Sequence, residues 1–233
     1  LLLILSQGLN FVRLFHRYKK EQMEEMKAER AKIEEERAES QRMMAELIEL
    51  KAQLAKKDGI KTGEVIWQAK RKCPSLVIAQ PHYREYENFS RRVGEIFYQY
   101  TDLIEPFGID ESWLDVTASK NLFGDGKQIS DSLRERIRRE VGITVSVGVS
   151  FNKVFAKLGS DYKKPDATTV FSRDVVEEKI YPLPVTSLLY VGRAAAKTLE
   201  SMYIRTIGEL ARADRAFVAS RLGKMGEMIH DYA

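Results

Sequence analysis

Two neighbouring carboxylates are the residues of this chain best suited to chemistry. Asp110 and Glu111 stand between two short segments, Leu103-Ile104 and Leu114 to Val116, whose apolar character predicts strands. Gly108 suits a tight connection, so the pattern predicts a hairpin that carries both acids at its tip. On a straight strand the two side chains would point to opposite faces, whereas at a hairpin tip both can reach one ion.

Carboxylate oxygens in such a position are typical ligands of Mg²⁺, which commonly takes one or two carboxylates together with substrate phosphates. Asp110 and Glu111 therefore predict a magnesium site. The alternative is that the two acids only keep a turn soluble, as charged residues usually do.

A group of lysines follows about forty residues later. Ile143 to Val149 predicts a buried strand, and Ser150 or Asn152 is suited to cap the helix that follows it. The basic residues of this region are Lys153, Lys157 and Lys164. Lysines on a helix commonly form only a solvated face. Next to an acidic hairpin they predict the other half of a site for a magnesium-bound triphosphate.

Three segments carry a resemblance to a known family. Gly108 to Thr117, Ser146 to Pro165 and Gly59 to Pro74 closely resemble the Y-family (translesion, UmuC/DinB-like) DNA polymerases, and the likeness runs in unbroken order over about residues 59–233. It implies that Asp110 bridges two catalytic Mg²⁺ ions and that Glu111 holds the ion that activates the primer hydroxyl. It also implies that Lys164 contacts the triphosphate of an incoming deoxynucleotide, with primer-template DNA as the other partner.

The chain departs from that family before Gly59. The family begins with a strand that bears another metal-binding Asp, and a Tyr and an Arg of its fingers hold the triphosphate. In their place this chain has Leu50 to Asp58, which is helical in character and unrelated. We therefore expect a fragment at both ends, with a foreign amino-terminal segment and impaired catalysis, so that whether the chain is an active enzyme stays open.

The resemblance and the periodicity together predict an α+β fold. The expected parts are a helical or coiled-coil segment (1–58), a remnant of the fingers (59–75), a palm (76–171) and a thumb (172–233). The palm is expected to pack helices against a mainly antiparallel sheet. Its predicted elements are a strand at 76–79, helices at 82–100 and 128–141, and a strand at 168–171.

The expected thumb contains a second candidate binding element. Leu188 to Leu199 and Ile204 to Ala211 resemble a helix-hairpin-helix. Backbone amides at a helix start can hold a DNA phosphate without reading the bases. The residues predicted to bind DNA are Val191, Gly192, Arg193 and Lys197. A plain helical turn is the alternative, and Met202-Tyr203 departs from the small residue that many relatives have at the turn.

The amino-terminal segment is rich in helix-forming residues and has no proline or glycine from Phe11 to Lys57. One heptad series contains Met26, Ile33, Leu47 and Leu54. Self-association of residues 19–57 as a weak coiled coil and a long solvated helix are both consistent with this pattern. Leu1 to Leu5 is apolar but far shorter than the roughly 20 residues of a membrane span.

The remaining composition restricts the choice of function only mildly. A net charge of +4 and a pI near 9.0 are compatible with a nucleic-acid partner. The single cysteine, Cys73, excludes an internal disulfide and a multi-cysteine zinc site, which favours a reduced, cytoplasmic setting.

Three functions are therefore to be compared. The first is a translesion DNA polymerase fragment that transfers deoxynucleotides to a primer 3′-hydroxyl with Mg²⁺. The second is a non-catalytic DNA-binding or assembly protein that retains palm and thumb. The third is a nucleotide cyclase on a palm-like fold, against which Lys164-Pro165 and the thumb-like tail argue.

Overall fold

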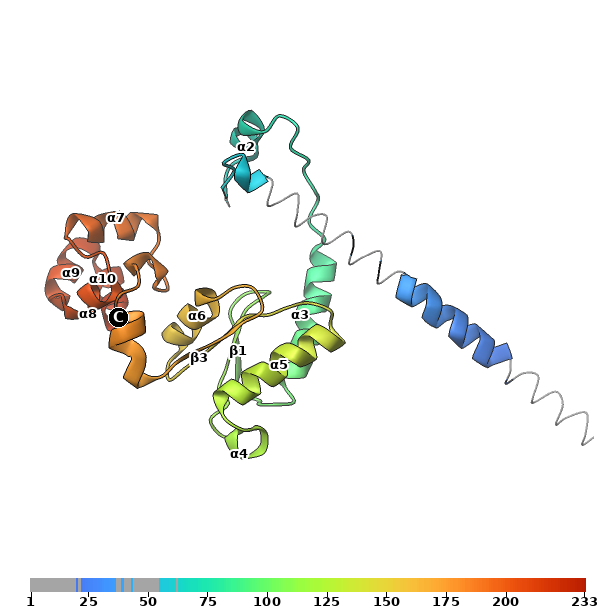
Figure 1. Cartoon of the computed structure of the whole chain (residues 1–233). Coiled ribbons are helices and arrows are strands. Elements are labelled where there is room, and N and C mark those ends of the chain that lie inside the picture. Colours follow the sequence, from blue (N-terminus) through green and yellow to red (C-terminus); the bar gives the residue numbers. More distant parts are fainter. Residues whose placement is uncertain (1–19, 21, 37–38, 40–42, 44–54, 62) are drawn as a thin grey trace, which may run out of the picture. The chain divides into compact units, whose positions relative to one another are not determined.

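The computed structural model of the chain describes residues 20, 22–36, 39, 43, 55–61 and 63–233. The chain divides into two compact units, Leu1–Gln80 and Pro81–Ala233 (Figure 1). The four domain ranges expected from the sequence do not follow this division and stay predictions.

The first unit is helical where it is described. Residues 22–36 form a helix, as predicted, and its apolar side chains are about half exposed: Met23 at 49%, Met26 at 53% and Ile33 at 54%. Leu47 and Leu54 of the heptad series lie outside the described residues, so the coiled coil stays a prediction.

A second short helix, α2 (Ile66–Lys72), follows in the same unit. Lys72 Nζ ties it back to the preceding turn by donating to Glu64 Oε2 at 2.9 Å and to the Gly59 carbonyl at 2.8 Å. The strand predicted at 76–79 is wrong, because these residues are irregular and pair with no strand in the described part of the chain. Apolar character alone does not make a strand without a hydrogen-bonding neighbour.

The second unit combines helices with two small sheets, which confirms the α+β class. β1 (Ile104–Pro106) pairs antiparallel with β2 (Ser112–Leu114), whereas β3 (Val147–Ser150) pairs parallel with β4 (Thr168–Phe171). The described residues thus do not form the single, mainly antiparallel sheet that was expected. The parallel pair arises because helix α6 (Lys153–Tyr162) crosses over between its two strands.

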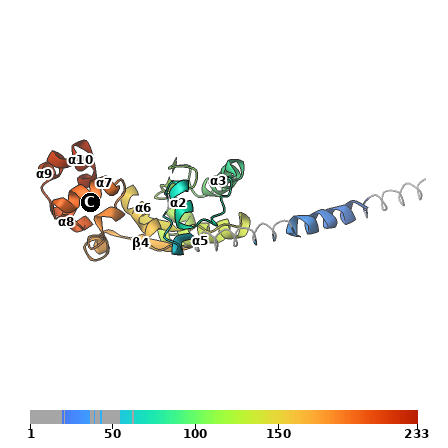
Figure 2. The ribbon, with the colours of Figure 1, turned by 90° about the horizontal axis from the view of Figure 1, so that it is seen from above.

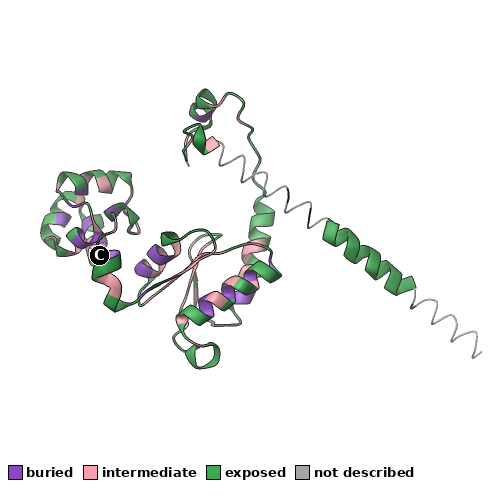
Figure 3. Cartoon of the chain, viewed as in Figure 1, coloured by how far each residue is buried: buried purple, intermediate pink, exposed green. Residues whose placement is uncertain are grey.

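Two long helices supply one core of this unit. The helix predicted at 82–100 is α3 (Tyr83–Phe97), and the one predicted at 128–141 is α5 (Gly126–Glu140). A shorter helix, α4 (Lys120–Phe123), precedes α5. The buried residues of α5 recur along one side of the helix, whose other side is exposed (Figure 3). The buried members of this core are Ile96, Tyr100, Ile129, Leu133, Ile137 and Val141.

Helix α6 packs very closely on β3. A Cβ atom added at Gly148 would lie 1.8 Å from the backbone oxygen of Ala156, so the helix touches the strand where the strand has no side chain. Of the two capping residues that the sequence offered, Asn152 caps the helix by accepting a hydrogen bond from the Phe155 amide at 2.7 Å. These two contacts fix where the lysines of α6 lie relative to the sheets.

The carboxyl-terminal part of the unit is a group of short helices (Figure 2). They are η1 (Arg173–Val175), η2 (Val176–Ile180), η3 (Val185–Ser187), α7 (Arg193–Ser201), α8 (Ile207–Arg212), α9 (Arg215–Leu222) and α10 (Lys224–Tyr232). Their buried residues form one core with Phe155 and Leu158 of α6 and Phe171 of β4. The helical group is therefore continuous with the strand-helix-strand unit that precedes it.

Candidate active site

The acidic pair lies at the tip of a hairpin, where the sequence predicted it. Residues 107–111 connect β1 to β2, and the Phe107 amide donates to the Glu111 carbonyl at 2.8 Å. Gly108 has a φ of 98°, a left-handed conformation that glycine adopts without steric cost. The rings of Phe107 and Trp113 pack against each other, tilted by 39° with centroids 4.6 Å apart, and stabilise the turn from one side.

Helix α6 holds the hairpin in place. Trp113 Nε1 donates to the Lys153 carbonyl at 3.0 Å, and the Lys153 ammonium pairs with Glu105 of β1. The same ammonium lies 5.6 Å from the centre of the Trp113 ring, within the range of a cation–π contact. Because these contacts join β1, β2 and the first turn of α6, the acids and the lysines of α6 keep a fixed relation.

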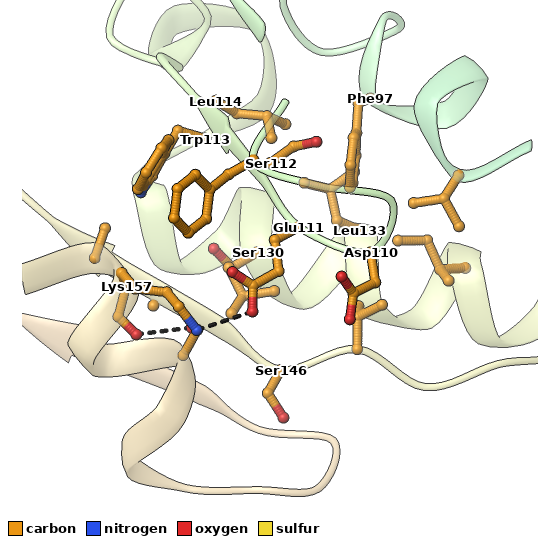
Figure 4. A pocket seen from close by; sticks show the side chains of 18 of the residues that line it. Phe97, Asp110, Glu111, Ser112, Trp113, Leu114, Ser130, Leu133, Ser146 and Lys157 are labelled. Atoms are coloured by element: carbon orange, nitrogen blue, oxygen red, sulfur yellow. Dashed lines mark hydrogen bonds and ion pairs between the residues drawn. The ribbon is translucent and has the colours of Figure 1, made fainter. Parts of the chain in front are cut away.

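Both acids and two of the lysines face one cavity of about 850 Å³. Asp110, Glu111, Lys157 and Lys164 are among its lining residues, and apolar side chains of α3 and α5 form much of its wall. The carboxylates of Asp110 and Glu111 lie on the same side of the hairpin loop, with Lys157 beside Glu111 (Figure 4). The two acids therefore do not point away from each other, as they would on a straight strand.

A chain of ion pairs connects these charges. Lys157 Nζ lies 2.9 Å from Glu111 Oε1 and 2.8 Å from Asp161 Oδ2, and Lys164 Nζ lies 2.6 Å from Asp161 Oδ1. Only 17% of the Lys157 side chain is exposed, against 55% for Lys164. Asp161 thus joins the more buried lysine to the more exposed one.

The ion pairs shift the pKa values of Lys157 and Asp161. Burial by itself lowers the pKa of Lys157, but its hydrogen bonds to Asp161 and Glu111 outweigh burial and raise that pKa above its ordinary value. Burial raises the pKa of Asp161, and the two lysines outweigh it, so that this pKa lies below its ordinary value. Both groups are therefore charged throughout the neutral range.

The oxygen donors of the hairpin fit a divalent cation. Glu111 already binds one cationic group, the Lys157 ammonium, through Oε1, and Asp110 opens onto the same cavity. Two carboxylates completed by phosphate oxygens are a common set of ligands for Mg²⁺. No group of three or more His, Cys, Asp or Glu side chains suited to a metal occurs among the residues that the structure describes.

Lys157 belongs to the lysine group predicted from the sequence, but its contact with Glu111 was not predicted. It makes the direct contact with Glu111, whereas Lys164, the residue chosen for the triphosphate, contacts Asp161. The i, i+4 spacing of Lys157 and Asp161 on a helix was the available signal. The partner on the hairpin could not be found this way because it lies 46 residues away in the sequence.

The predicted DNA-binding residues lie together at the start of α7. Gly192 is its N-cap residue, Val191 is buried with 7% exposed, and Arg193 and Lys197 are exposed one turn apart. Tyr203 in the turn before α8 has a φ of 63°, so a large residue occupies the conformation that a glycine would favour. The turn still forms, and α8 begins with a capping box between Thr206 and Glu209.

Comparison with known proteins shows the family of the chain. Residues 38–161, more than half of the chain, match the impB/mucB/samB family. The chain belongs to this family. Among curated impB/mucB/samB relatives, DNA polymerase IV of Acetivibrio thermocellus is 52% identical over 179 residues, which cover 77% of this chain and 45% of that protein. DNA polymerase IV of Clostridium kluyveri is 38% identical over 179 residues, with the same coverage.

Solved structures of the Y family share the fold. DinB from Sulfolobus solfataricus superposes with a TM-score of 0.68 at 27% identity, over 76% of this chain and 53% of that one. An insertion ternary complex of Dbh DNA polymerase gives a TM-score of 0.66 at 27% identity, over 76% and 53%. The resemblance to Y-family translesion polymerases is thus confirmed for part of the chain.

The chain spans about half the length of the curated relatives that it matches, which limits what the family carries over. Among its described helices, none has the length and apolar character needed to cross a membrane.

Proposed function

We propose that this chain supplies the palm and thumb of a translesion DNA polymerase, and that it binds primer-template DNA and a deoxynucleoside triphosphate. The observation that supports this most is the meeting of two carboxylates and two lysines at one cavity. The similarity to proteins called DNA polymerase IV gives the arrangement its substrate class.

Each side chain has a definite part in this proposal. Asp110 and Glu111 would hold Mg²⁺, which when bound supplies positive charge to the phosphates and to the attacking oxygen. Lys164 neutralises oxygens of the triphosphate, and Asp161 limits the directions that its ammonium can take.

The start of α7 holds the phosphate backbone of DNA in this proposal. The groups that do so are the side chains of Arg193 and Lys197 and the backbone amides of Val191 and Gly192.

Catalysis by this polypeptide is expected to be weak. A two-ion mechanism requires both ions to be held about 3.5–4 Å apart so that the attacking and leaving oxygens are clamped together. The hairpin offers two carboxylates for that task. The phosphates would then have to supply the remaining ligands, and a second ion would be held loosely.

A primer-extension assay with the purified chain tests the proposal. We expect DNA binding and magnesium-dependent nucleotide binding, with little extension of the primer. Robust incorporation that Asp110→Ala abolishes would contradict the proposed impairment and establish an active polymerase.

A non-catalytic DNA-binding or assembly protein is the second candidate, and the small number of carboxylates at the cavity favours it. It predicts DNA binding with no effect of Mg²⁺ on nucleotide affinity. Measuring nucleotide affinity with and without Mg²⁺ on the same DNA complex separates the two functions.

A further inference from the structure

A second cluster of charges surrounds Arg134 of α5. It lies beside the segment that connects α6 to β4, residues 163–167, here called the Lys164 segment. The Arg134 side chain is 21% exposed, and it does not line the cavity of the candidate site. Asp166, which Arg134 binds, does line the cavity, together with Lys164 and Pro165. Arg134 therefore contacts, from outside the cavity, the segment that carries the lysine proposed to bind the triphosphate.

Every N–H group of the Arg134 guanidinium has a partner. Nε donates to Asp166 Oδ1 at 3.1 Å, and Nη2 donates to the same oxygen at 2.9 Å and to the Asp166 backbone carbonyl. Nη1 donates to Asp131 Oδ1 at 3.2 Å and to Thr168 Oγ1 at 3.3 Å. A guanidinium has five N–H groups in a rigid plane, so its orientation is fully determined here.

The residue held in this way has an unusual backbone conformation. Asp166 has a φ of 49°, in the left-handed region that residues other than glycine seldom adopt. Such a conformation persists where surrounding contacts hold it. Arg134 binds both the carbonyl and the carboxylate of Asp166, so it fixes the direction in which the chain passes from Lys164 to β4.

The segment between α6 and β4 is held at both ends. At its start, Lys164 Nζ pairs with Asp161 of α6, and at its end Arg134 of α5 holds Asp166 and Thr168, the first residue of β4. Thr168 Oγ1 also donates to Asp131 Oδ1 at 2.6 Å, and the Ala167 carbonyl accepts from the Val147 amide at 2.8 Å. These two bonds keep the start of β4 in place without Arg134, so loss of Arg134 would release Asp166, which lies two residues from Lys164.

We propose that Arg134 is a positioning residue that fixes Lys164 for contact with the nucleotide triphosphate. This inference rests on the proposed function, because it assumes that Lys164 meets a triphosphate at the cavity. Arg134 itself does not line the cavity, and its effect passes through Asp166 to Lys164.

The chain offers a matched control in Arg138, which lies one turn further along α5. Arg138 Nη1 is 4.0 Å from Asp166 Oδ2, and 57% of its side chain is exposed. Arg138→Gln removes the same charge from the same helix and the same carboxylate neighbourhood, but it leaves the hydrogen bonds of Arg134 intact. Arg134→Lys keeps the charge and loses the planar set of donors.

The test measures the affinity of the whole chain, on primer-template DNA with Mg²⁺, for a non-hydrolysable deoxynucleoside triphosphate. Arg134→Gln is expected to weaken binding about tenfold, as misplacement of a charged contact does. Arg138→Gln should stay within about twofold, as for other exposed charges. Arg134→Lys should fall between the two. Equal losses for Arg134→Gln and Arg138→Gln would overturn the inference.

A double-mutant comparison shows whether Arg134 acts through Lys164. In a Lys164→Ala background, adding Arg134→Gln should cause no further loss of nucleotide affinity, since the positioned group is already gone. A further loss as large as in the native chain would mean that Arg134 acts independently of Lys164, and the inference would be wrong.

Hydrogen exchange separates this inference from the proposed function. The amides of residues 163–168 should exchange faster in Arg134→Gln than in Arg138→Gln, with no nucleotide present. Equal exchange in the two variants would overturn the inference even if nucleotide binds. A native chain that fails to bind nucleotide would instead overturn the proposed function, and the role of Arg134 toward the triphosphate with it.

Discussion

At the level of single residues, Asp161 is the group on which the arrangement of lysines depends most. It pairs with Lys157 through one carboxylate oxygen and with Lys164 through the other, so its single negative charge weakens the repulsion between the two ammonium groups. Lys157 is then free to direct its ammonium toward Glu111 as well. The sequence shows the spacing of these residues but not that one acid serves both lysines.

The lowered pKa of Asp161 gives a prediction about pH. Its carboxyl group binds a proton less readily in the folded than in the unfolded chain, so its contribution to stability is present above the ordinary carboxyl pKa of about 3.9. The contribution is lost as the pH falls through the lower folded-state pKa. Asp161→Asn should therefore reduce the free energy of unfolding at pH 7 by about 1 kcal/mol or less, given the 45% exposure of this side chain.

Urea unfolding of both proteins at pH 7 and near pH 3 checks this expectation. The difference between native chain and variant should shrink at the lower pH. Asp102→Asn is the control, because Asp102 is exposed and makes no ion pair within the described part of the chain. A difference that grows on acidification would show that the sign of the pKa shift is wrong.

At the level of elements, the contact of α6 with β3 decides where the lysines stand. A Cβ at Gly148 would lie 1.8 Å from the Ala156 oxygen and 2.5 Å from the Ser160 amide nitrogen. Both atoms belong to the backbone of α6, so the helix itself must move. Gly148→Ala should lower the free energy of unfolding by about 2–3 kcal/mol, the cost of overpacking a core contact.

Gly94→Ala is the matched control for this substitution. Gly94 lies inside α3, and a Cβ there would meet nothing within 4 Å. Alanine at such a position should be neutral or stabilise the helix by up to about 1 kcal/mol. Denaturant unfolding measures both variants, and an equal loss of stability in the two would refute the account of the α6–β3 contact.

Helix α7 allows a separate prediction about DNA. Arg193→Gln and Lys197→Gln should each weaken DNA binding to a similar extent on any sequence, because phosphate contacts carry no base information. Each should also reduce the slope of log affinity against log salt by about 1.

Binding measured over a series of salt concentrations tests this, with Arg221→Gln on α9 as the control. Arg221 is likewise an exposed arginine of the helical group. Slopes that change equally for all three variants would mean that α7 has no special part in holding DNA.

The elements also show which features a sequence can predict. The hairpin, α3, α5, α6 and β4 were predicted from apolar periodicity, Gly108 and the Asn152 cap, all of which act over a few residues. The parallel pairing of β3 with β4 was not, since it depends on how the chain returns after α6. The strand at 76–79 was wrong because its apolar residues have no strand beside them.

The candidate site follows the same rule. The acidic pair and the lysine group were found from residue type and spacing, whereas the contact of Lys157 with Glu111 and the clasp of Arg134 on Asp166 were not. The latter two join residues 46 and 32 positions apart in the chain. Only the packing of α5 and α6 around the hairpin and the Lys164 segment brings these groups together.

At the level of the whole molecule, family membership and local geometry support the same interpretation. The chain matches impB/mucB/samB proteins over residues 38–161 and shares the fold of Y-family polymerases, while it spans about half the length of its curated relatives. Its cavity brings together groups suited to a metal ion and a triphosphate. The proposed function requires that the hairpin acids hold a divalent cation on the nucleotide.

The most direct measurement is the binding of Mn²⁺, detected by electron paramagnetic resonance, to the chain with primer-template DNA and a non-hydrolysable deoxynucleoside triphosphate. Glu111→Gln should weaken nucleotide-dependent Mn²⁺ binding by at least about tenfold. Asp102→Asn, which changes an exposed acid just before the same hairpin that makes no ion pair within the described part of the chain, should leave it unchanged. If Glu111→Gln binds Mn²⁺ as tightly as the native chain does, the acids at the hairpin tip are not metal ligands and the account is wrong.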